Sequence, residues 1–101
     1  MEVRTAASPR DVKHYTTDRL REEFLIQNLF VPGKIKMVYS HIDRIITGAA
    51  VPAKETLTLT AGAELRAEYF LQRREMGIIN IGGAGTITVD GTVYEVAYKE
   101  G

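Results

Sequence analysis

The chain has 101 residues, and its thirteen lysines and arginines balance thirteen aspartates and glutamates, so the formal net charge is zero. This balance argues against nucleic-acid and membrane partners, which are bound through strongly basic surfaces. The chain contains no cysteine, which excludes disulfides and thiolate metal sites. A content of 45% hydrophobic and 26% charged residues is ordinary for one small soluble globular domain.

Two short helices are expected in the first quarter of the chain. Residues 8–11 (SPRD) combine a serine suited to the N-cap with a proline at the first helical position, and they predict a single turn. Residues 16–18 (TTD) offer a second start, and Leu20 with Phe24 forms an i, i+4 apolar pair. We therefore predict a short helix over residues 17–24.

Beyond this helix the pattern predicts short strands separated by glycine and proline. The run FLIQNLFV (residues 24–31) is apolar and ends at a Pro-Gly turn, as a buried strand does. Other stretches alternate between apolar and polar residues or are short apolar pieces. The predicted strands are residues 24–31, 34–39, 45–46, 57–60, 68–71 and the two arms of a hairpin within residues 85–96.

The hairpin has the clearest local chemistry. Residues 86–89 (TITV) alternate, Asp90-Gly91 supplies two residues that tolerate positive φ, and residues 92–96 resume the extended pattern. A type I′ turn places Val89 opposite Thr92, Ile87 opposite Tyr94, and Gly85 opposite Val96. Ile87, Val89, Tyr94 and Val96 then share one face. The glycines of residues 82–85 indicate a bend and not a phosphate-binding loop, because a strand follows them.

Six or seven short strands with helices only near the start favour a mainly β fold, a β-sandwich or jelly roll. No linker or repeat divides the chain, so residues 1–101 are expected to form one structural unit. A jelly roll usually has eight strands. Because no closing strand follows the hairpin, we expect a piece of a longer polypeptide. Residues 1–10 lack the apolar core of a signal peptide and no later run could span a membrane, so a cytoplasmic protein is expected.

Candidate chemistry is concentrated in residues 39–44 (YSHIDR). In one interpretation, His41 is a general acid/base held in one tautomer by Asp43, while Arg44 binds a substrate carboxylate. In the other, the segment is a hydrogen-bonded turn in which Asp43 orients His41 or pairs with Arg44. The remaining histidine, His14, is expected at the surface.

Other charged residues give weaker hypotheses. Arg73 and Arg74 are candidates for binding an acidic ligand, or they form an ordinary solvated charge run. Glu64, Glu68 and Glu75 could act as an acid–base pair, but are expected as surface carboxylates. No serine lies in a glycine-framed nucleophile elbow. Residue chemistry alone therefore gives no complete catalytic site.

Three longer strings carry a family resemblance: EEFLIQNLFV, MVYSHIDRIITGAAVP and YFLQRREMGIINIGGAGTITVDGTVYEV. In order and separation they closely resemble the amino-terminal part of the 5-keto-4-deoxyuronate isomerases of pectin breakdown. The resemblance covers nearly all of residues 1–101. It implies a cupin-like jelly roll that forms the first part of a bicupin, the second cupin belonging to the same parent chain.

The resemblance also implies an activity. These enzymes interconvert 5-dehydro-4-deoxy-D-glucuronate and 3-deoxy-D-glycero-2,5-hexodiulosonate, bind zinc through three histidines and a glutamate of the carboxy-terminal cupin, and assemble as hexamers. No His-x-His followed by glutamate exists here, so the zinc ligands are expected outside residues 1–101. This portion is then structural or oligomeric and inactive alone. The alternative is a non-catalytic cupin-like module for packing or sugar binding.

Overall fold

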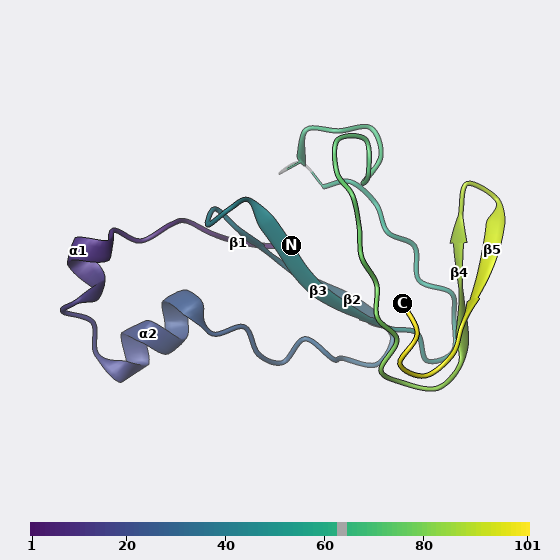
Figure 1. The fold of residues 1–101 in the computed structure, drawn as a ribbon, viewed down its shortest axis with the longest axis horizontal. Helices are drawn as coiled ribbons and strands as arrows, with labels where there is room; N and C mark the ends of the chain where they lie inside the picture. Colours follow the sequence, from purple (N-terminus) through teal and green to yellow (C-terminus); the bar gives the residue numbers. More distant parts are fainter. Residues whose placement is uncertain (63–64) are drawn as a thin grey trace.

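The computed structural model describes residues 1–62 and 65–101 as two small β-sheets with two short helices at one end (Figure 1). One sheet has three strands in the order β1-β2-β3, and the other is the β4-β5 hairpin. The elements are β1 (Glu2–Arg4), α1 (Pro9–Val12), α2 (Thr17–Phe24), β2 (Lys34–Ser40), β3 (Ile45–Val51), β4 (Gly85–Val89) and β5 (Thr92–Val96). The mainly β class with short N-terminal helices is confirmed, whereas the jelly roll stays a prediction.

Both helices begin where their caps predict. The Ser8 hydroxyl accepts a hydrogen bond from the Arg10 backbone N–H at 3.3 Å, and Pro9 occupies the first turn of α1. The Thr16 hydroxyl accepts from the Arg19 N–H at 3.3 Å, so α2 starts at residue 17 and ends at residue 24 as expected. On its solvated side, the hydrogen bond and charge of Glu23 raise the pKa of the Arg19 guanidinium.

Strand β2 lies at the centre of the larger sheet. It pairs antiparallel with β3 in a register that places Ser40 opposite Ile45 and Met37 opposite Gly48. On its other edge it pairs parallel with β1, from Glu2 opposite Val38 to Arg4 opposite Ser40. Strand β1 was not predicted, because three residues carry too little pattern. The predicted strand at residues 45–46 also stopped short of Gly48, whereas β3 continues through it to residue 51.

The hairpin is confirmed residue by residue. Gly85 pairs with Val96, Ile87 with Tyr94 and Val89 with Thr92. Asp90 has φ of 49° and Gly91 has φ of 81°, the two positive angles that a type I′ turn requires. The expected bend precedes it at residues 82–83, where the Asn80 side-chain amide donates to the carbonyls of Gly83 and Val96, both at 2.9 Å.

Three predicted strands are wrong. Residues 25–31 are irregular, with Asn28 at a left-handed φ of 59° that interrupts extension. Residues 57–60 form no ladder, although Leu57 and Leu59 are half-buried and the threonines between and after them are exposed. Residues 68–71 lie in a series of turns. In each case the apolar pattern indicated burial, but no strand of the described chain lies alongside to complete a ladder.

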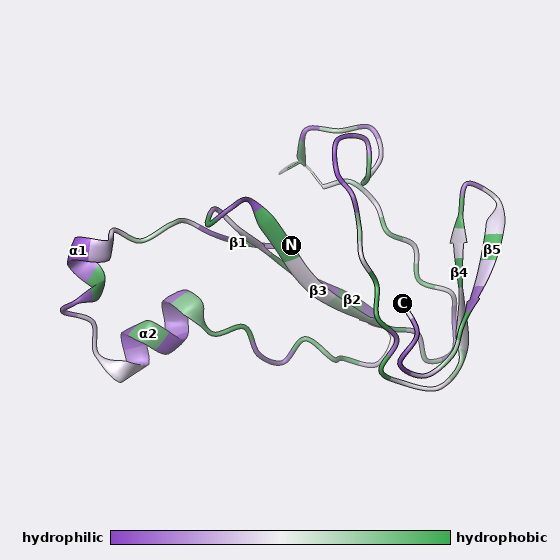
Figure 2. Cartoon of the chain, in the orientation of Figure 1, coloured by the Kyte–Doolittle hydropathy of each residue, from purple (hydrophilic) through white to green (hydrophobic). Residues whose placement is uncertain are grey.

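Little of the chain is buried. Val38 and Phe70 are the only hydrophobic residues of the described part that reach burial, with 4% and 9% exposed. The Cα radius of gyration is 15.9 Å, compared with about 13 Å for a compact domain of this length. Figure 2 shows that hydrophobic residues are spread along the strands and the long connections and are not gathered in one part of the chain. Among the described residues, no helix has the length and apolar character needed to cross a membrane.

Gly48 provides a test of the β2–β3 pairing. A Cβ at this position would lie 2.5 Å from the Met37 Cγ and 2.7 Å from the Lys36 carbonyl oxygen. We expect Gly48→Val to lower the free energy of unfolding by about 1–3 kcal/mol, because backbone atoms must shift. Urea unfolding followed by circular dichroism measures the loss.

The control is Gly85→Val, at a strand glycine where a Cβ would meet nothing within 4 Å. An equal effect of the two substitutions would contradict the close approach at Gly48.

Candidate functional site

Four residues around the β2–β3 turn form what we call the Tyr39 cluster: Tyr39, His41, Arg44 and Arg74. The Tyr39 and His41 rings meet edge to face, with centroids 5.2 Å apart and planes at 65°. The Arg74 guanidinium carbon lies 5.1 Å from the centre of the Tyr39 ring, a cation–π distance. Arg74 also donates a hydrogen bond to the Arg44 backbone carbonyl at 3.0 Å. A segment thirty residues away is thereby attached to the turn.

The turn itself has unusual backbone geometry. Asp43 and Arg44 both have positive φ, 55° and 51°. Asp accepts this region because its short polar side chain can bond locally, whereas for arginine it costs about 1–2 kcal/mol. The hydrogen bond from Arg74 to the Arg44 carbonyl holds the strained residue in place. The Ser40 hydroxyl stabilises the start of the turn by accepting from the Ile42 N–H at 3.1 Å.

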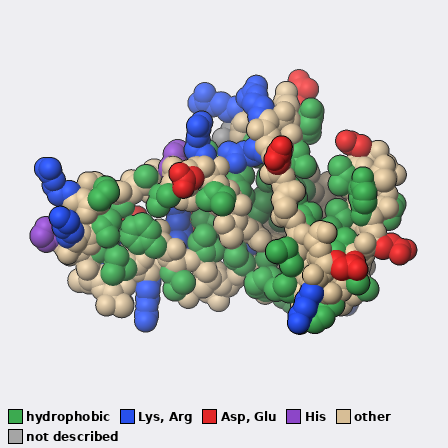
Figure 3. All heavy atoms as spheres, in the orientation of Figure 1, with side chains coloured by type: hydrophobic (Ala, Val, Ile, Leu, Met, Phe, Trp, Pro, Cys, Tyr) green, Lys and Arg blue, Asp and Glu red, His purple; other side chains and the backbone are tan. Residues whose placement is uncertain are grey.

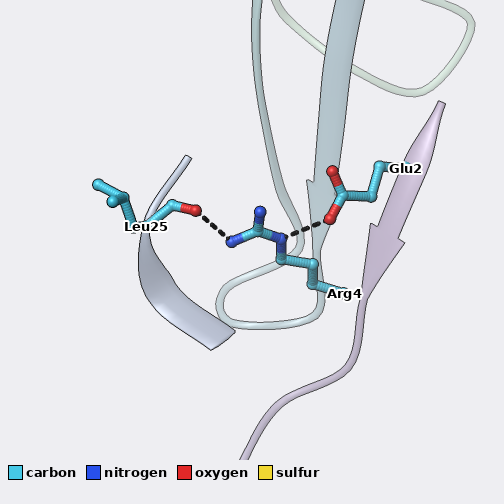
Figure 4. Close-up of polar contacts among 3 residues, drawn as sticks. All are labelled: Glu2, Arg4 and Leu25. Atoms are coloured by element: carbon cyan, nitrogen blue, oxygen red, sulfur yellow. Dashed lines mark hydrogen bonds and ion pairs between the residues drawn. The ribbon is translucent and has the colours of Figure 1, made fainter. Parts of the chain in front are cut away.

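Arg4 of β1 contacts the candidate turn through its backbone, and Figure 4 shows the contacts of its side chain. Its carbonyl accepts a hydrogen bond from the His41 backbone N–H at 2.8 Å, which positions the first residue of the turn. Its side chain donates to the Leu25 carbonyl at 2.7 Å and to the Glu2 carboxylate at 2.8 Å. Arg4 therefore links the end of α2, strand β1 and the candidate turn. Sequence reasoning missed Arg4, and it included Tyr39 in the candidate segment without giving its ring a role, since both roles depend on contacts between distant segments.

The predicted partners of His41 are not all present. The structure brings His41, Arg44 and Arg74 together, but within residues 1–62 and 65–101 no hydrogen bond or ion pair joins Asp43 to His41 or Arg44. His41 is exposed, and nothing in that range fixes its tautomer. The described residues thus do not show Asp43 orienting His41, and the acid/base role of His41 stays a prediction.

Arg73 lies apart from the Tyr39 cluster, although it is next to Arg74 in sequence. It donates to the Arg66 carbonyl at 3.4 Å and helps to line an open hollow of about 510 Å³. The other lining residues are Ala61, Gly62, Arg66, Ala67, Glu68 and Gln72. The Gln72 side-chain oxygen accepts from the Glu68 N–H at 2.7 Å, which fastens one wall. Arg73 therefore belongs to the hollow, whereas Arg74 belongs to the Tyr39 cluster.

Two of the three carboxylates considered from the sequence belong to the described residues. Glu68 belongs to the wall of the hollow and Glu75 is exposed, while Glu64 lies outside the described residues. His14, at the far end beside α1, is exposed as expected.

The zinc implied by the resemblance does not fit the residues that the structure describes. No three histidine, cysteine, aspartate or glutamate side chains in that range lie close enough together to hold a metal ion. Structural and catalytic zinc sites need at least three such ligands. The Tyr39 cluster offers positive charge. Arg74 donates one N–H to the Arg44 carbonyl, and its remaining N–H donors suit a carboxylate.

The Tyr39 ring can be tested by separating its aromatic face from its hydroxyl. We expect Tyr39→Leu to lower the free energy of unfolding by about 1 kcal/mol, because the ring contacts of Arg74 and His41 are lost. Tyr39→Phe is the matched control and should remain close to the parent, since it keeps the ring. Denaturant midpoints measure both, and equal losses would mean that the hydroxyl, and not the ring, anchors Arg74.

Comparison with known proteins finds relatives that match this chain over its whole length. The chain is 79% identical over 101 residues to a 4-deoxy-L-threo-5-hexosulose-uronate ketol-isomerase of Lachnoclostridium phytofermentans, covering all of this chain and 37% of that protein. Proteins of the same name from Lachnospira eligens and Halalkalibacterium halodurans are 59% and 60% identical, each with 36% of its length covered. No family model matches the chain.

The aligned region includes the Tyr39 cluster and the hairpin, since each of these three alignments covers at least 99% of the chain. The chain spans little more than a third of the length of these curated relatives. The resemblance found in the sequence is thereby confirmed: over all of its length this chain is related to the amino-terminal portion of the 4-deoxy-L-threo-5-hexosulose-uronate ketol-isomerases.

Proposed function

We propose that this chain is part of an isomerase that interconverts an aldose and a ketose form of a deoxy-uronate, 5-dehydro-4-deoxy-D-glucuronate and 3-deoxy-D-glycero-2,5-hexodiulosonate. The observation that carries the proposal is the 79% identity to a uronate ketol-isomerase along the whole chain. A pectin-degrading pathway is a part of the proposal that comes from the sequence resemblance. A cytoplasmic location is a part that comes from the expectation drawn from the sequence itself.

The reaction defines what the complete protein must do. A carbonyl moves to the next carbon when that hydroxyl-bearing carbon loses a proton, which gives an enediol-like intermediate, and a proton is added to the former carbonyl carbon. In the same change the former carbonyl oxygen gains a proton and the oxygen of the hydroxyl-bearing carbon loses one. The carboxylate of the substrate requires a cationic partner, for which arginine is best suited. Arg74 beside Tyr39 and Arg73 at the hollow are the candidates on this chain.

We assign this portion a structural role in the complete enzyme. The described residues offer no three-ligand group for zinc, so no step of the reaction is assigned to a metal on this chain. Zinc, a second cupin of the same parent chain and a hexameric assembly remain parts of the proposal that rest on the resemblance. In this view residues 1–101 form barrel wall and subunit contact.

A chimera tests the activity. In it, this chain replaces the aligned 37% of the L. phytofermentans ketol-isomerase. We expect the chimera to isomerise 4-deoxy-L-threo-5-hexosulose-uronate, which chromatography of the product measures. We also expect it to bind stoichiometric zinc. Residues 1–101 alone should do neither. A folded chimera without turnover would instead favour a packing or sugar-binding module, and tight zinc binding with turnover by residues 1–101 would refute the structural role.

A substitution at His41 in that chimera tests whether this residue takes part in proton transfer. Because His41 is exposed and has no hydrogen bond to Asp43, we expect His41→Ala to leave kcat within about threefold of the parent. His14→Ala is the matched control at an exposed histidine far from the turn. A loss in kcat of about 100-fold with an unchanged denaturation midpoint would assign proton transfer to His41 and contradict this expectation.

A further inference from the structure

The chain leaves far more surface in contact with water than a folded protein of its mass does. Its accessible surface is 8391 Å². A compact monomer of 11.2 kDa exposes about 5,700 Å². The excess is therefore about 2,700 Å². Hydrophobic side chains are visible across much of the surface, including the end formed by β4 and β5 (Figure 3).

At that end the hairpin has two chemically different faces. Paired residues share a face, so Ile87, Val89, Tyr94 and Val96 form one side, which we call the apolar hairpin face. Val89 is 43% exposed and Tyr94 54% exposed. The opposite side carries Thr86, Thr88, Val93 and Glu95. This division indicates that one face is shaped for burial. The described chain half-buries Ile87 and Val96 but leaves Val89 and Tyr94 exposed.

A two-stranded ribbon of this kind is only marginally stable by itself. Sheets are stabilised when their apolar face packs against another layer. The required layer must be large, since stable interfaces between partners bury about 800 Å² on each side and the excess here is about three times that. The chain has no net charge, so the cover is expected to be held by apolar contact and not by charge attraction.

We propose that the apolar hairpin face packs against polypeptide of the same parent chain, namely the part of the relatives' length that this chain does not span. That part is 63% of the L. phytofermentans protein, given the 37% covered here. A segment of this size can supply a whole second layer. The proposal rests on the proposed function, because it needs the parent to be a longer ketol-isomerase.

Paired cysteine substitutions test this packing in the chimera. Val89→Cys places a thiol on the apolar hairpin face, and Thr88→Cys places one on the opposite face at the adjacent position. Residues 1–101 contain no cysteine, so labelled hairpin peptides can be followed by mass spectrometry. We expect the thiol of the Val89→Cys variant to be modified at least about tenfold more slowly than that of the Thr88→Cys variant in native protein. The two rates should become equal in urea.

Each other outcome has a defined meaning. Equal native rates in an active chimera would overturn the packing while leaving the proposed function intact, and an inactive chimera would fail the proposed function itself. Protection that disappears on dilution to the monomer would assign the face to a second copy and overturn the proposal. If Val89→Cys does not fold, Tyr94→Cys with Val93→Cys as its control gives the same comparison on the other strand.

Discussion

The pairing of β2 on both edges is the constraint on which the rest of this structure depends. Strand β3 reaches it through a four-residue turn, and β1 reaches it from the start of the chain. Each neighbour therefore relies on β2 for the partners of its backbone N–H and carbonyl groups. Val38, on this strand, is the most buried hydrophobic residue of the described chain. The Tyr39 cluster begins one residue further along.

The position of the candidate turn follows from this arrangement. Ser40 pairs with Ile45, which leaves residues 41–44 to close the connection, and two of them adopt left-handed backbone angles. Such a turn is held by contacts from outside itself: the Arg4 carbonyl at one end and the Arg74 guanidinium at the other. The candidate residues are thus positioned by the sheet and by a distant segment, while Asp43 contributes through its backbone angle.

Local chemistry explains which parts of the fold could be predicted. The two helices follow from their capping residues, and the hairpin register follows from Asp90-Gly91, because these signals act over a few residues. Residues 25–31 and 57–60 were mistaken for strands because an apolar pattern reports burial, whereas a strand also needs a neighbour. In the candidate site, His41 and Arg44 could be predicted to lie near each other because they are only three residues apart in the sequence. Nothing in the sequence distinguishes Arg74, which contacts Tyr39, from Arg73, which does not.

Strand β1 has a consequence for motion at the turn. Its three residue pairs with β2 close a loop of more than thirty residues. Few backbone hydrogen bonds therefore offset the considerable chain entropy that is lost when this loop closes. Segments of this kind open locally far more often than the whole protein unfolds. When β1 detaches, the His41 amide loses its acceptor on Arg4 and the end of α2 loses its link through Leu25. Fraying at residues 2–4 and loosening of the turn are therefore one event.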